Sequence, residues 1–172
     1  MSGPFGASQW MYDASSGFYP TVLEDSLKFN NDESQYLSWT PATAGNRKTW
    51  TWSGWVKRGN IDITQYVFGA GADSDNQTFL RFNSNNKLQF RNEVSNSVKI
   101  VETSAVFADP SAWYNIVVVY DSSNSTANDR MRLYVNGERI TDIGNNVTPS
   151  LNLDSSINSN SYEMFIGTSR GP

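Results

Sequence analysis

The 172-residue sequence contains neither cysteine nor histidine. Without cysteine, the chain can form no disulfide bond and no thiolate metal site. Without histidine, it lacks the commonest general base and the commonest metal ligand of proteins. A Ser–His or Cys–His nucleophile is therefore excluded, and few routes to catalysis remain.

Charge and long apolar runs are also scarce. Charged residues make up 17% of the chain and the net charge is -4, so no basic stripe is available for nucleic acid. No apolar run is long enough to span a membrane, and residues 1–6 do not have the pattern of a secretory signal. Asn, Ser and Thr take the place of charge, which is typical of extracellular and virion surfaces. A protein of a virus particle released by lysis would have such a surface and would need no secretory signal.

Aromatic residues, by contrast, are abundant at 13% of the chain, and they favour pleated, half-buried strands. Short segments of alternating polarity are separated by polar turns, whereas no helical period of useful length occurs. The predicted strands are residues 27–29, 37–39, 49–57, 66–69, 79–82, 87–91, 98–101, 113–120, 131–135, 138–140 and 165–166. Residues 141–161, rich in Asn and Ser, are predicted to be a long loop. This pattern predicts an all-β antiparallel β-sandwich.

Two of these strands carry most of the information. Side chains alternate across a strand, so residues 49–57 place Trp50 and Trp52 on one face and Trp55 on the other. Residues 113–120 are apolar on both faces. Such a strand is expected to be central in its sheet or to be covered by another layer.

Residues 1–25 are interpreted as an N-terminal docking arm, and residues 26–172 as the sandwich domain. Glycine, proline and serine interrupt any regular period in the arm. Its apolar side chains are nevertheless too many for a free tail. They are Phe5, Trp10, Met11, Tyr12, Phe18 and Tyr19. Two interpretations stay open: the arm packs on its own domain, or it docks on a partner chain.

Four segments, in this order, resemble the laminin-G-like and concanavalin A-like lectin superfamily. They are TWSGWVK (51–57), WYNIVVVYD (113–121), LYVNG (133–137) and FIGT (165–168). The Asn-Gly pair of the third segment is also a strong hairpin signal. A narrower likeness, carried by residues 3–6, 26–29 and 41–59, is to laminin-G-like proteins of marine bacteriophages. Those proteins resemble tail-fibre or capsid-decoration components.

The resemblance implies a concanavalin A-like jelly roll, and it also raises a question. The family continues beyond the FIGT segment with another strand, whereas this sequence ends at Pro172. We therefore expect a sandwich that lacks its last strand, being truncated or completed by a partner. The unpaired edge would accept a segment from a partner, from the N-terminal arm or from a further C-terminal part.

Catalysis is not expected, although the fold also hosts glycoside hydrolases. Those enzymes need two carboxylates at a defined separation, which the family places on one strand. Neither residues 50–57 nor residues 113–120 contain an acidic side chain. The remaining acids lie scattered at strand ends.

Two binding sites are candidates on chemical grounds. The exposed face of residues 49–57 would offer Trp55 as a stacking platform for sugar; the alternative is that Trp55 packs under a loop or against the second sheet. Asp73, Asp75 and Asn76 offer hard oxygen ligands suited to calcium. The alternative there is a polar turn between two strands. No other cofactor is expected.

The leading prediction is a structural and interaction protein of the phage virion, serving as a tail fibre, appendage or head decoration. Its partners would be other virion proteins and copies of itself, and a trimer would suit a fibre. The alternative is a lectin module that recognises host-surface glycan. A glycoside hydrolase is the third interpretation.

Overall fold

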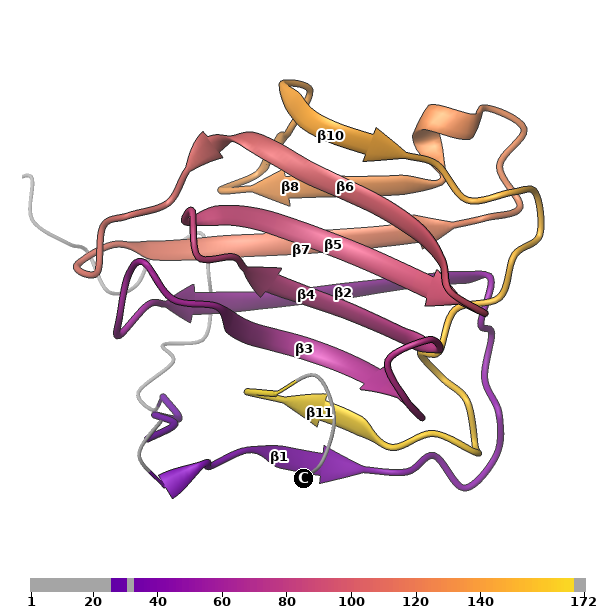
Figure 1. Ribbon diagram of the computed structural model, residues 1–172, viewed down its shortest axis with the longest axis horizontal. Coiled ribbons are helices and arrows are strands. Elements are labelled where there is room, and N and C mark those ends of the chain that lie inside the picture. Colours follow the sequence, from indigo (N-terminus) through magenta and orange to yellow (C-terminus); the bar gives the residue numbers. More distant parts are fainter. Residues whose placement is uncertain (1–25, 31–32, 169–172) are drawn as a thin grey trace, which may run out of the picture.

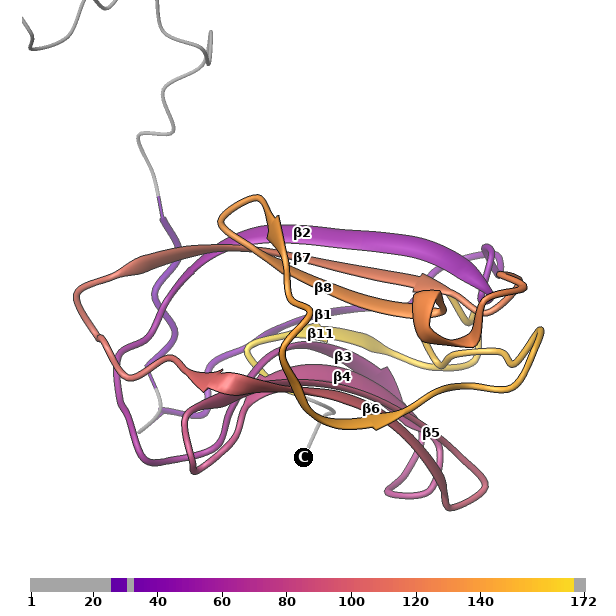
Figure 2. The same ribbon diagram turned by 90° about the horizontal axis from the view of Figure 1, so that it is seen from above.

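The computed structural model describes residues 26–30 and 33–168, which form two antiparallel sheets packed face to face (Figures 1 and 2). The predicted all-β antiparallel sandwich is therefore confirmed. The aromatic side chains of the predicted arm, from Phe5 to Tyr19, lie outside the described residues. No helix in the described part of the chain is long and apolar enough to cross a membrane.

The larger sheet has seven strands in the order β1-β11-β3-β4-β5-β6-β10. They are β1 (Leu37–Trp39), β11 (Met164–Ile166), β3 (Gln65–Gly71), β4 (Gln77–Phe82), β5 (Lys87–Val94), β6 (Ser97–Val106) and β10 (Ile143–Val147). The smaller sheet has four strands in the order β2-β7-β8-β9. They are β2 (Thr49–Lys57), β7 (Trp113–Asp121), β8 (Met131–Val135) and β9 (Glu138–Arg139), and a 3-10 turn, η3 (Ala127–Asp129), precedes β8.

The core lies between the two sheets and is built from the inward-facing half of each alternating strand. Trp50 on β2 stacks on Tyr120 of β7 with ring centroids 5.6 Å apart, and it meets Phe90 of β5 edge-on at 5.7 Å. Trp52 stacks on Phe68 of β3 at 5.5 Å. These contacts tie β2 to both sheets, because a large aromatic ring spans the space between facing layers.

Strand β7 lies between β2 and β8, as its apolar faces predicted. No third layer covers its outer face within the described residues, and Trp113 at its start remains 47% exposed. Of the two explanations for a strand apolar on both sides, the central position is the one that applies.

Two sequence predictions about secondary structure are wrong. The predicted loop 141–161 contains β10, an edge strand that pairs with β6. Its side chains are half-buried or exposed, so it lacks the apolar alternation by which strands are recognised. Residues 27–29 form no strand. Phe29 instead packs over Gly167 so closely that a Cβ atom added to Gly167 would lie 3.1 Å from the Phe29 ring.

Candidate functional site

The outer face of the four-stranded sheet presents two exposed indole rings. Alternation along β2 turns Trp55 away from the core, and the ring is 55% exposed. The alternative that Trp55 packs under a loop or against the second sheet is therefore wrong. In the β2–β7 register, Trp55 lies opposite Asn115, and Lys57 lies opposite Trp113. Trp55 and Trp113 are consequently diagonal neighbours on one face, a separation that aromatic side chains can bridge.

The turn between β8 and β9 adds two more residues to this face. Asn136 and Gly137 have φ values of 53° and 85°, as the predicted Asn-Gly hairpin requires. The Asn115 backbone N–H donates to the Asn136 side-chain oxygen at 2.9 Å, and the Asn136 backbone N–H donates to the Asn115 carbonyl at 2.8 Å. These bonds hold the turn against the start of β7, beside the two tryptophans.

Together these residues line a shallow depression of about 510 Å³. Its lining is Trp55, Trp113, Asn115, Asn136 and Gly137. Within the described part of the chain, the Asn115 carboxamide and the Asn136 side-chain nitrogen make no hydrogen bond. Each amide can therefore donate to a ligand, and that of Asn115 can also accept. The depression thus combines flat apolar rings with uncharged hydrogen-bonding groups.

Sequence reasoning identified only one of these residues, Trp55. The sequence predicts Trp113 only as an apolar strand residue, and no sequence pattern marks Asn115 as a binding residue. What unites them is the pairing of β2 with β7, whose register the sequence does not specify. The available signal was the predicted hairpin at Asn136-Gly137, which marks the end of the strand beside β7.

The predicted calcium ligands occupy the turn between β3 and β4. The Asp73 carboxylate accepts hydrogen bonds from the backbone N–H groups of Asp75 and Asn76, both at 2.8 Å. The Asn76 side-chain oxygen accepts from the backbone N–H of Ser95 at 3.2 Å. These oxygens therefore stabilise the turn, and no cluster of three or more metal-ligating acids exists among the residues described. The calcium site stays a prediction.

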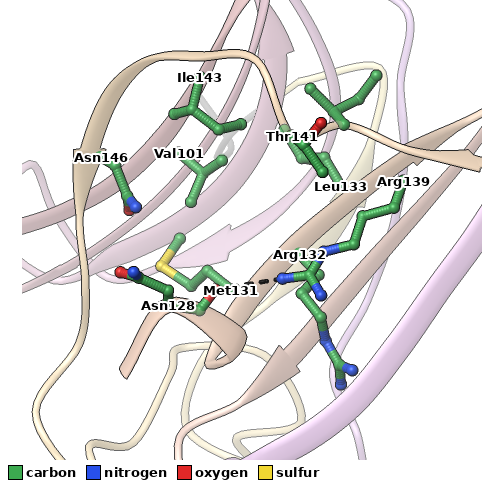
Figure 3. Close-up of a pocket in the computed structure, with 10 residues that line it drawn as sticks. Val101, Asn128, Met131, Arg132, Leu133, Arg139, Thr141, Ile143 and Asn146 are labelled. Carbon is green, nitrogen blue, oxygen red and sulfur yellow. Dashed lines mark hydrogen bonds between the residues drawn. The ribbon is translucent and has the colours of Figure 1, made fainter. Parts of the chain in front are cut away.

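A second depression, of about 320 Å³, lies between the β8–β9 hairpin and β10 (Figure 3). Val101, Met131 and Leu133 contribute apolar surface to it, and Arg139 lies among its polar residues. The Arg139 guanidinium is ion-paired with Asp129, so its charge is already compensated. Arg132 also lines this depression, and its buried Nε has no hydrogen-bond partner within the described residues. This depression differs from the face that carries Trp55 in having no aromatic ring in its lining.

The acidic side chains do not form a catalytic pair at either depression, since no Asp or Glu lines them. Glu102 accepts hydrogen bonds from the side chains of Asn83 and Gln89, at 3.0 and 2.7 Å. A hydrogen bond from the Ser123 hydroxyl lowers the pKa of Asp121 and so keeps that carboxyl ionised. Asp121 therefore lacks the raised pKa expected of a general acid in glycoside hydrolysis.

Two solved structures of similar fold give the architecture a context. The chain superposes on a heptameric SAP-like pentraxin from Limulus polyphemus with a TM-score of 0.51 and 17% identity, covering 78% of this chain and 58% of that one. For domains LG4-5 of the mouse laminin α1 chain the TM-score is 0.55 and the identity 12%, covering 79% of this chain and 32% of that one. The chain thus spans less than two thirds of either structure, and these identities show the fold alone. No curated protein matches.

The family is shown by the sequence itself. A model of the family described as the concanavalin A-like lectin/glucanases superfamily matches residues 31–171, which is most of the chain. The match runs through every described strand, including β2 and β7, which carry the exposed tryptophans. The chain belongs to the concanavalin A-like lectin/glucanases superfamily.

Proposed function

We propose that this chain is a non-catalytic attachment module of a bacteriophage particle, and that it binds saccharide on a host surface through the Trp55–Trp113 depression. The observation that carries the proposal is the pair of exposed indole rings beside unpaired amide groups on one sheet face. Members of this superfamily are often binding proteins, and no Asp or Glu lines either depression described above.

The chemistry of the depression favours a saccharide as ligand. A sugar ring has an apolar face of C–H groups that stacks on an indole, and a rim of hydroxyl groups that both donate and accept hydrogen bonds. The rings of Trp55 and Trp113 supply the first kind of contact, and the Asn115 amide supplies the second. No charged side chain lines the depression, so an uncharged sugar is the natural ligand.

The assignment to a virion rests on sequence. Residues 3–6, 26–29 and 41–59 resemble laminin-G-like proteins of marine phages, and the charge-poor surface suits a particle exposed to the medium. In this proposal the partners are other virion proteins and further copies of the chain. No metal or cofactor is required.

A second candidate function uses the same surface. Exposed tryptophans are over-represented among the residues that dominate protein interfaces. The Trp55–Trp113 face could therefore attach the chain to another virion protein, as a structural decoration would require. The two functions differ in the ligand and share the site.

A glycan array probed with wild type, Trp55→Ala and Trp113→Ala separates them. Trp39→Ala is the matched control, because Trp39 is 42% exposed and lies on β1, away from this face. We expect a restricted set of saccharides to bind wild type and the control, with at least tenfold weaker signals for the other two variants. If wild type bound no saccharide on the array, the saccharide-binding function would be wrong and the structural role would remain.

Two further measurements test the remaining parts of the proposal. Incubation with each bound oligosaccharide should release no new reducing ends, and product formation would show that the module is catalytic. Mass spectrometry of density-purified particles should find the chain at a fixed ratio to the major capsid protein. Its absence from purified particles would overturn the virion assignment.

A further inference from the structure

The depression between the β8–β9 hairpin and β10 opens into the layer between the two sheets. On this side the smaller sheet ends in β9, which has two residues, and the larger sheet ends in β10, which has five. Val101 of β6 is in register with Asn146 of β10 on one side and with the core residue Phe90 of β5 on the other. The inner face of the larger sheet therefore continues from the core into the depression.

The floor of this depression is aliphatic. Its apolar lining comes from β6, β8, β10 and the residue after β9, and consists of Val101, Met131, Leu133, Ile140 and Ile143. Figure 3 shows the Met131 side chain directed toward Val101. The volume of about 320 Å³ is at the small end of the range of about 300–1,000 Å³ in which proteins hold small molecules. Such a floor suits a short saturated chain better than a sugar, which has no aromatic ring to stack on here.

The rim of the depression is cationic. Arg132 and Arg139 line it, and no Asp or Glu does. Arg139 reaches over the depression and donates a hydrogen bond to the backbone carbonyl of Asn128 at 3.4 Å (Figure 3). Its ion pair with Asp129 joins side chains that are 40% and 33% exposed, so solvent weakens the pair and an anionic ligand can compete for the guanidinium. The buried Arg132 Nε is a donor without a partner in the described chain, which also favours an anion.

We propose that this depression binds a small anionic amphiphile, whose saturated chain lies on the aliphatic floor and whose carboxylate lies beside Arg139. A carboxylate accepts strong, charge-assisted hydrogen bonds from a guanidinium. A chain that replaces water over the floor gains the free energy of apolar burial. The site is independent of the Trp55–Trp113 depression, because the two share no lining residue.

Titration calorimetry of the full chain with octanoate, decanoate and octanol tests both halves of the ligand. Each methylene that leaves water is worth about fourfold in affinity, so decanoate should bind about sixteenfold more tightly than octanoate. Octanoate should bind about fivefold more tightly than octanol, because only the carboxylate forms charged hydrogen bonds. Arg139→Gln should remove the preference for octanoate and leave the effect of chain length unchanged.

Two substitutions in β10 locate the ligand. Asn145 and Asn146 are adjacent and exposed, but only Asn146 lines the depression. Asn146→Trp should fill the depression and weaken decanoate binding at least tenfold. Asn145→Trp is the matched control and should bind decanoate as wild type does. Trp55→Ala should also bind decanoate normally, since the Trp55 ring lines the other depression.

Methyl NMR of methionine provides a measurement on the unsubstituted chain. Decanoate should shift the signal of the Met131 methyl group, which Met131→Leu identifies, and should leave that of Met164 on β11 unchanged. A Met131 signal that does not shift would overturn the proposal, and so would loss of decanoate binding in Trp55→Ala.

Three calorimetric results would also overturn it: no binding of decanoate, equal affinities for octanoate and octanol, or wild-type affinity for decanoate in Asn146→Trp. Saccharide binding is measured separately on the array with wild type. Failure of the amphiphile site would therefore leave the proposed function standing, and a failed array would leave the amphiphile site standing.

Discussion

Trp50 and Trp55 are the same residue type on opposite faces of β2, and we predict opposite consequences when each is replaced by alanine. Trp50 is buried, stacks on Tyr120 and donates a 2.8 Å hydrogen bond to the Ser155 hydroxyl. Removal of such a ring costs about 3–5 kcal/mol through lost contacts and the remaining cavity. The lost hydrogen bond adds about 1 kcal/mol. Together these losses are a large share of the free energy of unfolding of a typical domain, which is about 5–15 kcal/mol.

Trp55→Ala should leave stability nearly unchanged and weaken binding. The ring is 55% exposed, which is about 130 Å² for a side chain of about 240 Å². A sugar that covers one ring face removes about half of this area from water. At about 25 cal/mol per Å², that contact is worth about 1.6 kcal/mol, or about fifteenfold in affinity. The free energy of unfolding should change by less than about 1 kcal/mol.

Urea unfolding followed by far-ultraviolet circular dichroism measures the first effect, and calorimetric titration with the best array saccharide measures the second. Circular dichroism is preferred over fluorescence because the variants differ in their tryptophans. If Trp55→Ala destabilised the fold as much as Trp50→Ala, the assignment of the two faces of β2 would be wrong. If Trp55→Ala bound saccharide as tightly as wild type, the ligand would lie elsewhere.

Three further predictions concern the core, the hairpin and the calcium candidate. Burial raises the pKa of Tyr120 to about 12, above the usual 10 of an unfolded chain, so its neutral form is favoured when folded. This shift contributes about 2–3 kcal/mol to the free energy of unfolding below pH 10, and the contribution is lost as the pH rises to 12. Tyr120→Phe should therefore reduce the fall in stability between pH 10 and pH 12, and an unchanged slope would contradict this. Gly137→Ala forces a side chain onto a residue with φ of 85°, so it should cost about 1 kcal/mol in urea unfolding and weaken saccharide binding, and wild-type behaviour in both assays would refute the role of the turn. Calorimetric titration of a chelator-treated sample with calcium should give no heat if Asp73 serves only the turn, whereas binding that Asp73→Ala abolishes would establish the site.

The alternation of the sequence predicted most of the fold, because strand side chains divide strictly between two faces. It placed Trp50 and Trp55 on opposite faces of β2 before any strand was paired, but it left open whether Trp55 was exposed or packed; the structure shows Trp50 buried and Trp55 exposed. It failed at β10, an exposed edge strand that is held by pairing with β6 and carries no apolar alternation. It also failed at Phe29, which packs on Gly167 from an irregular segment.

The sequence by itself determined the fold class, the family and the face on which each β2 side chain lies, because these depend on local alternation and on ordered motifs. Only the tertiary structure decided which residues meet. The register of β2 against β7 brings Trp55 to Trp113 and Asn115, from a segment far along the chain. The stacking of a seven-stranded sheet on a four-stranded one leaves Leu37 and Trp39 uncovered. Strand register and sheet overlap depend on long-range packing of the whole core, which no short segment of sequence encodes.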